Sequence, residues 1–468
     1  MTTVLRNPSF SPVCPKKPQK SLISRIGVSF NKPILLVLIL ILLILSTLIG
    51  DLFPIPPATT GPFACTFGKD YSDDNAQTLI QTHDGGYALA GITWSYGTGG
   101  DMWLIRTDSD GTPLWNHTFG GQKKDFAFAL IQTRDGGFGL AGATYSFGVG
   151  KSDIWLIKLD NEGSIQWEKT LGGAGDEVAS TLLETDDGDF VLTGYTSSYG
   201  AGNTDIWLLK TDSKGNLLYS QTFGGTKDDV ATAMIQTHDG EFILTGSTSS
   251  FGMGNKDVWL LKADKFGSLV WSHTFGGVGR DQAQALVQSS DGYAIAGETR
   301  LFSENYRDFW LIKTDFEGNS QWTKTYGGTE REGAETLIHT EDGGYLLVGY
   351  STTNNNTGYS DILIVKTDAS GNEEWEERLG GDYHDVASAA LETNDGYVLA
   401  GITNAPKFLP YYSGGDIWLV KTDKNGQDTF KNGDEFNNTI ISVVLVTFTP
   451  IILWYSILVT KNRKTTKS

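Results

Sequence analysis

Apolar and polar residues alternate in short runs along most of this chain, and the runs end at glycine or aspartate. Residues 126–133, Phe-Ala-Phe-Ala-Leu-Ile-Gln-Thr, alternate and then meet the turn sequence of residues 134–137, Arg-Asp-Gly-Gly. A second run covers residues 138–144, a third covers 153–159 and a fourth covers 164–171. Alternation over about four to eight residues between turn signals is typical of strands. The pattern predicts a unit of four strands.

The third run of this unit recurs along the chain. Segments of the form Asp-x-Trp-Leu-x-Lys-Thr, or close variants of it, begin at Asp101, Asp153, Asp205, Asp257, Asp308, Asp361 and Asp416. The steps between these residues are 52, 52, 52, 51, 53 and 55. A period near fifty, with four strands in each unit, indicates a β-propeller. Seven copies predict an all-β, seven-bladed propeller over residues 61–428.

The last unit ends after its third strand, at residues 422–426. Its missing fourth strand has a counterpart at the other end of the chain, because residues 63–68 match residues 115–120 in register. We therefore expect the N-terminal strand to complete the seventh blade, so that the ring has no open edge. Aromatic residues recur at one position of the third strand and one of the fourth, as at Trp155 and Trp167. We expect them to form the core between blades.

Two apolar runs flank the repeats. Residues 34–49 are apolar except for Ser46 and Thr47, and residues 440–459 are uncharged. A membrane-spanning helix needs about 20 apolar residues, which predicts transmembrane helices at residues 33–53 and 440–460. A cleaved signal peptide is the alternative for the first run.

Basic residues set the predicted orientation in the membrane. Residues 1–32 precede the first run and residues 461–468 follow the second, and both segments carry Lys and Arg but no acid. The positive-inside rule places both segments in the cytoplasm and the repeats on the extracellular side of the cell membrane. We expect residues 1–32 to be disordered. The two cysteines, Cys14 and Cys65, then lie on opposite sides of the membrane, so we expect no disulfide.

Charge is partitioned in the same way. The 468-residue chain carries 36 basic and 55 acidic residues, a formal net charge of −19. Ten of the basic residues and none of the acids lie in residues 1–50 and 461–468. A body as acidic as the remainder repels nucleic acid and anionic lipid. We expect no nucleic-acid partner.

The repeat contains Asp-Gly-Gly-Tyr…Ala-Gly-x-Thr, then Asp-x-Trp-Leu-x-Lys-Thr-Asp-x-x-Gly…Trp…Thr-Phe-Gly-Gly. This pattern, over residues 61–428, resembles β-propeller repeat proteins of bacterial and archaeal cell surfaces. The resemblance implies surface display and interaction roles without an assigned reaction. The turn at residues 160–163 with Trp167 also resembles the hairpin of quinoprotein propellers. Those enzymes typically have eight blades, and many carry a vicinal cysteine pair that this chain lacks.

One acidic residue stands just before the first strand of every unit. We expect these acids to form a circle on the face away from the membrane, where they suit Ca²⁺, which takes about six to eight oxygen ligands. The alternative is that each accepts backbone N–H bonds in its own inter-blade turn. Calcium is the one cofactor that the sequence suggests. The acids are Asp74, Asp125, Glu177, Asp229, Asp281, Glu332 and Asp385.

Motifs for catalysis are missing from the sequence. No two of the six histidines share a metal-ligand spacing such as His-x-x-x-His, and no Gly-x-Ser-x-Gly elbow or phosphate loop has a strand–helix context. The sequence therefore predicts a protein that is not an enzyme. The alternative is a metal-dependent propeller enzyme that uses the acidic face.

The repeat breaks down in the loops between second and third strands. Units one to four share a Ser-Phe/Tyr-Gly loop, whereas units five to seven have residues 301–307, 353–359 and 404–412 instead. These loops lie on adjacent blades and combine aromatic residues with Arg, Asn and Pro, which favours a recognition surface. Neutral drift or packing of the loops on each other is the alternative. The candidate ligand-binding residues are Phe302, Tyr306, Arg307, Tyr359, Phe408, Leu409, Tyr411 and Tyr412.

Taken together, these patterns predict a membrane-anchored propeller displayed outside the cell. It would act as a binding or adhesion module for a glycan, an envelope component or a protein. A purely structural envelope protein is a further alternative. The sequence names no particular ligand.

Overall fold

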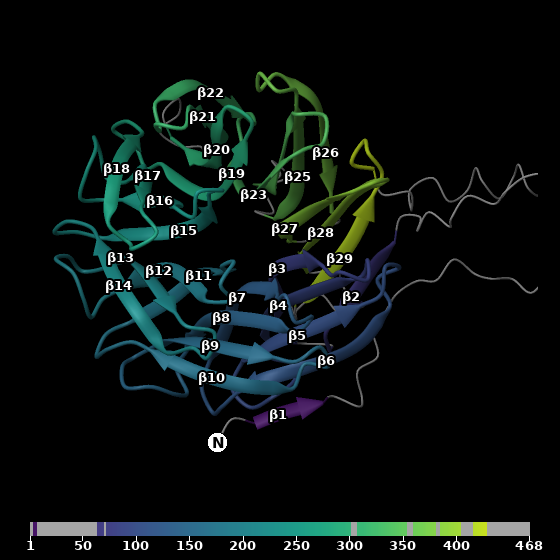
Figure 1. Ribbon diagram of the computed structural model, residues 1–468. Helices are drawn as coiled ribbons and strands as arrows, with labels where there is room; N and C mark the ends of the chain where they lie inside the picture. The colour runs from purple at the N-terminus through teal and green to yellow at the C-terminus, as the bar shows by residue number, and fades with distance from the viewer. Residues whose placement is uncertain are drawn as a thin grey trace, which may run out of the picture. The chain divides into compact units, whose positions relative to one another are not determined.

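The computed structural model describes residues 3–6, 63–69, 72–300, 307–352, 359–380, 384–403 and 415–427. Within these ranges the chain forms strands β1 to β29, and no helix there is long and apolar enough to span a membrane. The predicted helices at 33–53 and 440–460, and the basic tail at 461–468, lie outside the described residues. The strands form seven antiparallel sheets (Figure 1).

The first four sheets follow one another along the chain, each running from the centre of the ring outward. Blade 1 contains β3 (Asp74–Gln81), β4 (Tyr87–Thr93), β5 (Asp101–Thr107) and β6 (Pro113–Gly120), with β1 (Thr3–Arg6) outside β6. Blade 2 contains β7 (Asp125–Gln132), β8 (Phe138–Thr144), β9 (Asp153–Leu159) and β10 (Ile165–Leu171). Blade 3 contains β11 (Glu177–Glu184), β12 (Phe190–Thr196), β13 (Asp205–Thr211) and β14 (Leu217–Phe223). Blade 4 contains β15 (Asp229–Gln236), β16 (Phe242–Thr248), β17 (Asp257–Ala263) and β18 (Leu269–Phe275).

The remaining three sheets complete the ring. Blade 5 contains β19 (Gln282–Ser289), β20 (Gly292–Thr299), β21 (Asp308–Thr314) and β22 (Ser320–Tyr326). Blade 6 contains β23 (Glu332–His339), β24 (Tyr345–Thr352), β25 (Ser360–Thr367) and β26 (Glu373–Leu379). Blade 7 contains β27 (Asp385–Thr393), β28 (Gly396–Thr403), β29 (Asp416–Thr422) and β2 (Ala64–Phe67).

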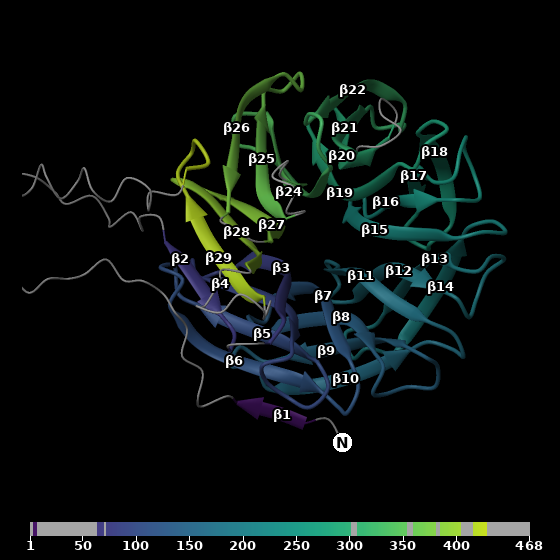
Figure 2. The same ribbon diagram turned by 180° about the vertical axis from the view of Figure 1, so that it is seen from behind.

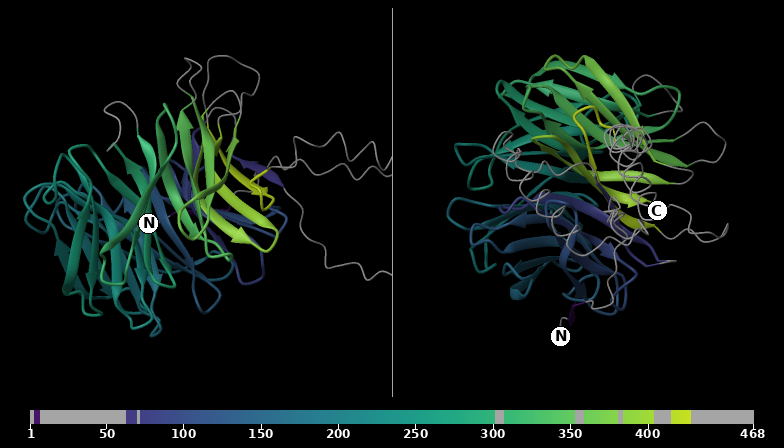
Figure 3. Two further views of the ribbon diagram at one scale, coloured as in Figure 1. Left: turned by 90° about the horizontal axis from the view of Figure 1, so that it is seen from above. Right: turned by 90° about the vertical axis from the view of Figure 1, so that its right-hand side faces the viewer.

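The innermost strand of each blade contacts the innermost strand of the next, and β27 of blade 7 contacts β3 of blade 1. The seven-bladed, four-stranded propeller predicted from the repeats is confirmed (Figure 2). The strands run between two faces of the ring (Figure 3). We call the face where the first strands begin the upper face. The lower face carries the tight turns after first and third strands.

The seventh blade closes as the sequence predicts. Strand β2 pairs antiparallel with β29, with Ala64 opposite Val420 and Phe67 opposite Ile417. The backbone N–H of Lys421 also donates to the carbonyl of Phe63 at 2.8 Å. The last blade thus combines three strands from the end of the described chain with one from its beginning.

Aromatic residues join consecutive blades at two levels. The third-strand tryptophans are buried, as at Trp155 and Trp207, except Trp418 of blade 7, which is partly buried. Each fourth-strand aromatic packs beneath the lower-face turn of the next blade, where a Cβ at Gly215 would lie 2.6 Å from the Trp167 ring. That glycine also has a φ of +76°, so both conformation and space require glycine. The predicted inter-blade role of the aromatics is confirmed.

Every first strand contains a β-bulge at the same place. In blade 3 the register shifts between Ala179 and Thr181, which leaves Ser180 unpaired with β12. The same shift occurs in all seven blades. A glycine on the second strand makes the bulge fit, because a Cβ at Gly194 would overlap the Val178 carbonyl oxygen. Bulges re-aim side chains, and here each bulged residue faces the centre of the ring.

The N-terminal residues differ from the sequence expectation. Strand β1 pairs antiparallel with β6, with Thr3 opposite Gly120, inside a segment that we expected to be disordered. Cys65 in β2 is disulfide-bonded. The only other cysteine of the chain is Cys14, which lies outside the described residues. The expectation of no disulfide is therefore wrong, because it rested on a membrane between the two cysteines.

We predict that Gly194→Ala destabilises the propeller by about 1–3 kcal/mol, because the added methyl group must displace the bulge carbonyl. Gly328→Ala is the matched control, since a Cβ there meets nothing within 4 Å. Chemical denaturation measures both changes. Equal stability of the two variants would contradict the steric argument.

We also predict a reducible link between the peptides that carry Cys14 and Cys65. Mass spectrometry of a digest prepared without reductant detects it, and Cys14→Ser removes it. Two free thiols in the full chain would contradict the link. That result would agree instead with a membrane span at residues 33–53.

Candidate binding cavity in the central channel

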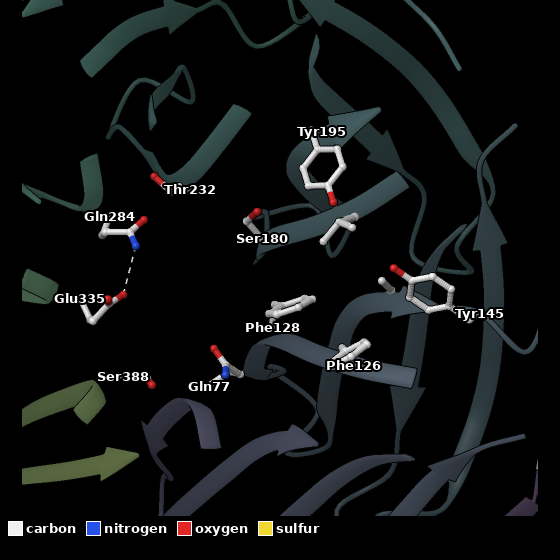
Figure 4. Close-up of a pocket in the computed structure, with 12 residues that line it drawn as sticks. Gln77, Phe126, Phe128, Tyr145, Ser180, Tyr195, Thr232, Gln284, Glu335 and Ser388 are labelled. Atoms are coloured by element: carbon white, nitrogen blue, oxygen red, sulfur yellow. Dashed lines mark hydrogen bonds between the residues drawn. The ribbon is translucent and has the colours of Figure 1, made fainter. Parts of the chain in front are cut away.

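A cavity of about 520 Å³ occupies the centre of the ring. Every first strand supplies its bulged residue to the wall (Figure 4). Blades 2 and 3 add residues that stand nearer the upper face in the strand register. The bulged residues are Gln77, Phe128, Ser180, Thr232, Gln284, Glu335 and Ser388. The additional residues are Phe126, Ala143, Tyr145, Val178 and Tyr195. Because only one side chain comes from each blade at the bulge, the seven blades can present seven different groups.

One side of the cavity is aromatic. The rings of Phe126 and Phe128 stack with centroids 5.8 Å apart, and Tyr145 meets Phe126 edge-on at 6.3 Å. Tyr195 adds a phenol from β12 (Figure 4). Burial, with the nearby Tyr145, raises the pKa of the Tyr195 hydroxyl. It therefore remains a neutral hydrogen-bonding group at physiological pH.

The side formed by blades 5 and 6 is polar. Gln284 Nε2 donates to Glu335 Oε2 at 3.1 Å, and both lie across the channel from Tyr145 and Tyr195 (Figure 4). The Glu335 side chain reaches the cavity but lies deep inside the ring. Burial, followed by the charge of Glu298, raises the Glu335 pKa to about 7. The carboxyl group can therefore accept or donate a proton near neutral pH.

An ion-pair network supports this polar side. Arg307 Nη1 donates to both oxygens of Glu298, at 2.5 and 2.7 Å, and Gln282 Nε2 donates to Glu298 Oε1 at 2.5 Å. Lys256 Nζ in turn donates to Gln282 Oε1 at 3.0 Å. Glu298 is therefore paired with Arg307 of its own blade, and Glu335 is the carboxyl group that lines the cavity wall.

The seven acids that precede the first strands are buried within their own inter-blade turns. Asp125 accepts from the Gly121 N–H at 3.0 Å, from Ser146 Oγ at 2.8 Å and from Thr144 Oγ1 at 2.5 Å. Glu177 accepts from the Gly173 N–H at 2.7 Å. These contacts favour the structural interpretation of the acids. Among the described residues, no three His, Cys, Asp or Glu side chains are placed to hold a metal ion.

Each acid has a second acid beside it across the blade interface. The aspartate that opens the third strand lies close to it, so that a Cβ at Gly120 would collide with Asp101 and lie 2.9 Å from Asp125 Oδ2. The same pair surrounds Gly68, where Asp416 and Asp74 meet at the closure. Burial, with the Asp125 charge, raises the Asp101 pKa to about 6.

The lower face carries an ion pair in every blade. A Lys or Arg of the third strand reaches an acid in the turn after the first strand, as Lys158 Nζ does to Asp135 Oδ2 at 2.8 Å. Burial disfavours the Asp135 charge, but hydrogen bonds from Lys158 and Thr133 outweigh burial and lower its pKa to about 2. The pairs are Arg106–Asp84, Lys158–Asp135, Lys210–Asp189, Lys262–Glu241, Lys313–Asp291, Lys366–Asp342 and Lys421–Asp395.

Two of the eight residues predicted for the upper loops are described. Arg307 is ion-paired with Glu298, and Tyr359 meets the His384 ring edge-on with centroids 5.1 Å apart. Both side chains are thus engaged within the propeller. Phe302, Tyr306, Phe408, Leu409, Tyr411 and Tyr412 lie outside the described residues.

Sequence reasoning missed the cavity wall. The signal was present as Ala-x in every first strand and glycine in every second strand, for example at Ala179 and Gly194. The variable residue after the alanine was the one to examine. The sequence analysis overlooked this residue because it assumed strict alternation. Without a bulge, the residue would pair with the second strand as its neighbours do.

No family model matches the chain. It is 28% identical over 224 residues to regulatory protein FlaEY of Caulobacter vibrioides, a stretch covering 42% of this chain and 22% of that protein. The chain thus spans about a fifth of the length of the protein it matches.

Solved structures with similar folds include a putative 6-phosphogluconolactonase from Bacteroides fragilis, with 15% identity, a TM-score of 0.44 and coverage of 79% of this chain and 98% of that one. The β-propeller domain of the Trilobed protease from Pyrococcus furiosus has 9% identity, a TM-score of 0.42 and coverage of 77% and 98%. Sqt1 from Chaetomium thermophilum has 14% identity, a TM-score of 0.42 and coverage of 76% and 90%.

The two sets of acids predict opposite pH dependences. Asp101 and Asp257 have folded pKa values of about 6 against an ordinary 3.8, so their contribution is lost as the pH rises through 6. Asp135, with a folded pKa of about 2, contributes above 3.8 and loses that contribution as the pH falls toward 2. The contribution of Asp101 and Asp257 is complete only below 3.8 and that of Asp135 only above 3.8, so we expect the highest melting temperature near pH 4.

Melting temperatures measured by circular dichroism between about pH 2 and pH 8 test this pH dependence. Asp101→Asn should reduce the fall in melting temperature on the alkaline side of the maximum, because the variant lacks one carboxyl group with a raised pKa. A melting temperature that rises steadily from pH 5 to pH 8 would contradict the assignment of the upper acid pairs.

Proposed function

We propose that this protein is a binding module whose central cavity holds a small polyhydroxylated molecule with an apolar face, of which a saccharide is the chief class. The observation that carries the proposal is the difference between the two sides of the cavity. Phe126, Phe128 and Tyr145 provide an apolar surface, and Gln284 and Glu335 provide hydrogen-bonding groups opposite it. Sugars stack their C–H faces on aromatic rings while their hydroxyl groups bond to amides and carboxylates.

The size of the cavity supports a small ligand. A volume of about 520 Å³ falls in the range of about 300–1,000 Å³ that small-molecule sites occupy. The hydroxyls of Ser180 and Thr232 donate to carbonyl oxygens of the next blade at 3.0 Å. Their oxygen lone pairs remain acceptors for ligand hydroxyls. The similarity to part of a protein described as regulatory agrees with a binding role.

We further propose that the propeller is displayed outside the cell. Disulfides persist in oxidising compartments, and Cys65 is disulfide-bonded. Of the two predicted spans, the one at residues 440–460 is compatible with a disulfide between Cys14 and Cys65, since it separates neither cysteine from the propeller. Display by that C-terminal anchor suits capture of a glycan, an envelope component or a protein-linked sugar. The upper loops of blades 5 to 7 would then contact the parts of the ligand that extend from the cavity.

Glu335 supports a second candidate function. A half-buried carboxyl group with a pKa of about 7 is typical of a general acid or base. An enzyme of this kind would convert the ligand that the aromatic side holds. Incubation of each bound ligand with the protein, followed by mass spectrometry, separates turnover from binding.

The test is binding of the full chain to a glycan panel, followed by titration calorimetry with the best ligand. We predict that Phe128→Ser weakens binding at least about tenfold. Serine stands at this position in blades 3 and 7, as Ser180 and Ser388, so the fold should accept it. Wild-type binding should strengthen as the pH rises through about 7 and Glu335 ionises. Glu335→Gln should abolish that dependence.

Glu373→Gln is the control, because Glu373 is exposed on the outermost strand β26. It should bind as the wild type does. Binding that survives both cavity substitutions would overturn the central site. If that binding were lost on replacing residues 404–412 by a blade-one loop, the site would be the upper loops.

A further inference from the structure

The lower rim of blades 3 and 4 exposes large apolar side chains. Leu217 and Leu218 open β14, and Leu269 and Val270 open β18, and each is about half exposed. Phe266, in the turn just before β18, is 66% exposed. These residues belong to the outermost strands of two adjacent blades. We call them the rim patch.

The apolar pairs of the rim patch do not recur in every blade. Blade 1 has Pro113 and the exposed Leu114 at the equivalent positions, and blade 2 has Ile165 and Gln166. The register of β22 and β26 places Ser320 and Glu373 where blades 3 and 4 have Leu217 and Leu269. The next positions in those strands are Gln321 and Glu374, and all four residues are exposed. The blade fold therefore does not require apolar residues at these positions. Neighbouring exposed apolar residues of this kind mark an interaction surface.

Basic residues accompany the patch at its outer tips. Lys214 lies in the turn of blade 3, where its charge interacts with Asp212. Lys265 lies in the turn of blade 4, with its Nζ 5.2 Å from the centroid of the Phe266 ring. The acids of the same turns, Asp212 and Asp264, accept backbone N–H bonds within those turns at 2.8–2.9 Å. Lysines beside exposed aromatic and aliphatic residues suit the headgroup region of a lipid bilayer.

Both ends of the ring leave from the same face as the patch. The turn from Asp423 to Gly426 closes with a 3.1 Å hydrogen bond, as the turn from Asp212 to Gly215 does at 2.9 Å. Ala64, the first residue of β2, lies opposite Val420 near that turn. The 41 residues after Gln427 include the uncharged apolar run 440–459. The described part of the chain thus leaves the ring on the face that carries the rim patch.

We propose that the rim patch rests on a phospholipid surface. Phe266 and the four aliphatic residues would enter the headgroup region, with Lys214 and Lys265 beside the phosphates. Blade 7, where the chain leaves, is separated from blades 3 and 4 by blades 5 and 6 on one side and blades 1 and 2 on the other. Contact at the patch together with an anchor at blade 7 would fix the lower face toward the membrane and leave the upper face open.

A photo-crosslinking experiment on the full chain tests this proposal. The crosslinker p-benzoylphenylalanine replaces Phe266 in one protein and Ser370, the equivalent turn residue of blade 6, in the other. Each protein is illuminated with phosphatidylcholine vesicles. We expect lipid adducts at position 266 at least several-fold above those at position 370. The double variant Leu269→Ser, Val270→Gln, which carries the residues of blade 5, should reduce the adducts while its melting temperature stays unchanged.

The outcomes separate the occupants of the patch. Lipid adducts at position 266 that the double variant reduces would support the proposal. Equal lipid adducts at both positions, or none, would overturn it. Adducts between two copies of the chain at position 266 would also overturn it and assign the patch to self-association.

Discussion

The fold depends on the pairing of β2 with β29. A four-stranded blade exposes apolar side chains on both faces, and each face is covered only when another blade stacks against it. Seven blades in an open arc would leave two such faces uncovered, and without β2 the last blade would lack its fourth strand. The residues from Ala64 to Phe67 remove this problem, because they supply the outer strand of the last blade and bring blade 7 against blade 1. Phe63 then packs beneath Gly111 as the fourth-strand aromatics of the other blades pack beneath their neighbours.

Most residues that repeat in every blade have a structural explanation in these contacts. The acids of the upper face fix the inter-blade turns, and the Lys–Asp pairs of the lower face tie the third strand to the turn after the first. The glycines occur where a carboxylate, a carbonyl or an indole leaves no space for a Cβ, as at Gly120, Gly194 and Gly215. Positions that vary between blades are consequently free to carry function. The wall of the cavity and the rim patch are both made of such positions.

These two regions are compatible with one orientation of the ring. Blades 2 and 3 contribute lining residues beyond the bulge, among them Tyr145 and Tyr195, in the upper part of the cavity. The rim patch lies at the lower, outer edge of blades 3 and 4. A lower face held against a membrane would leave the channel accessible from the other side. The acidic character of the body, which opposes adhesion of most of its surface to anionic lipid, would confine contact to the patch and the anchor.

The sequence alone determined the number of blades, their four strands and the closure by residues 63–68, because a repeating unit that cannot bury its own faces has few ways to stack. It also located the turns and the inter-blade aromatics, whose spacing is local. The tertiary structure decided which residues face the channel, since a single bulge after Ala179 and its equivalents reverses the alternation that sequence reasoning assumes. It likewise showed that Cys65 is disulfide-bonded. The predicted membrane span between the two cysteines had led us to expect no disulfide. Glu335 and Phe128 are brought to one cavity only when blades 2 and 6, about 200 residues apart in the chain, take their places around the ring. No local sequence pattern shows that these two residues share a cavity, so the candidate site could be identified only from the tertiary structure.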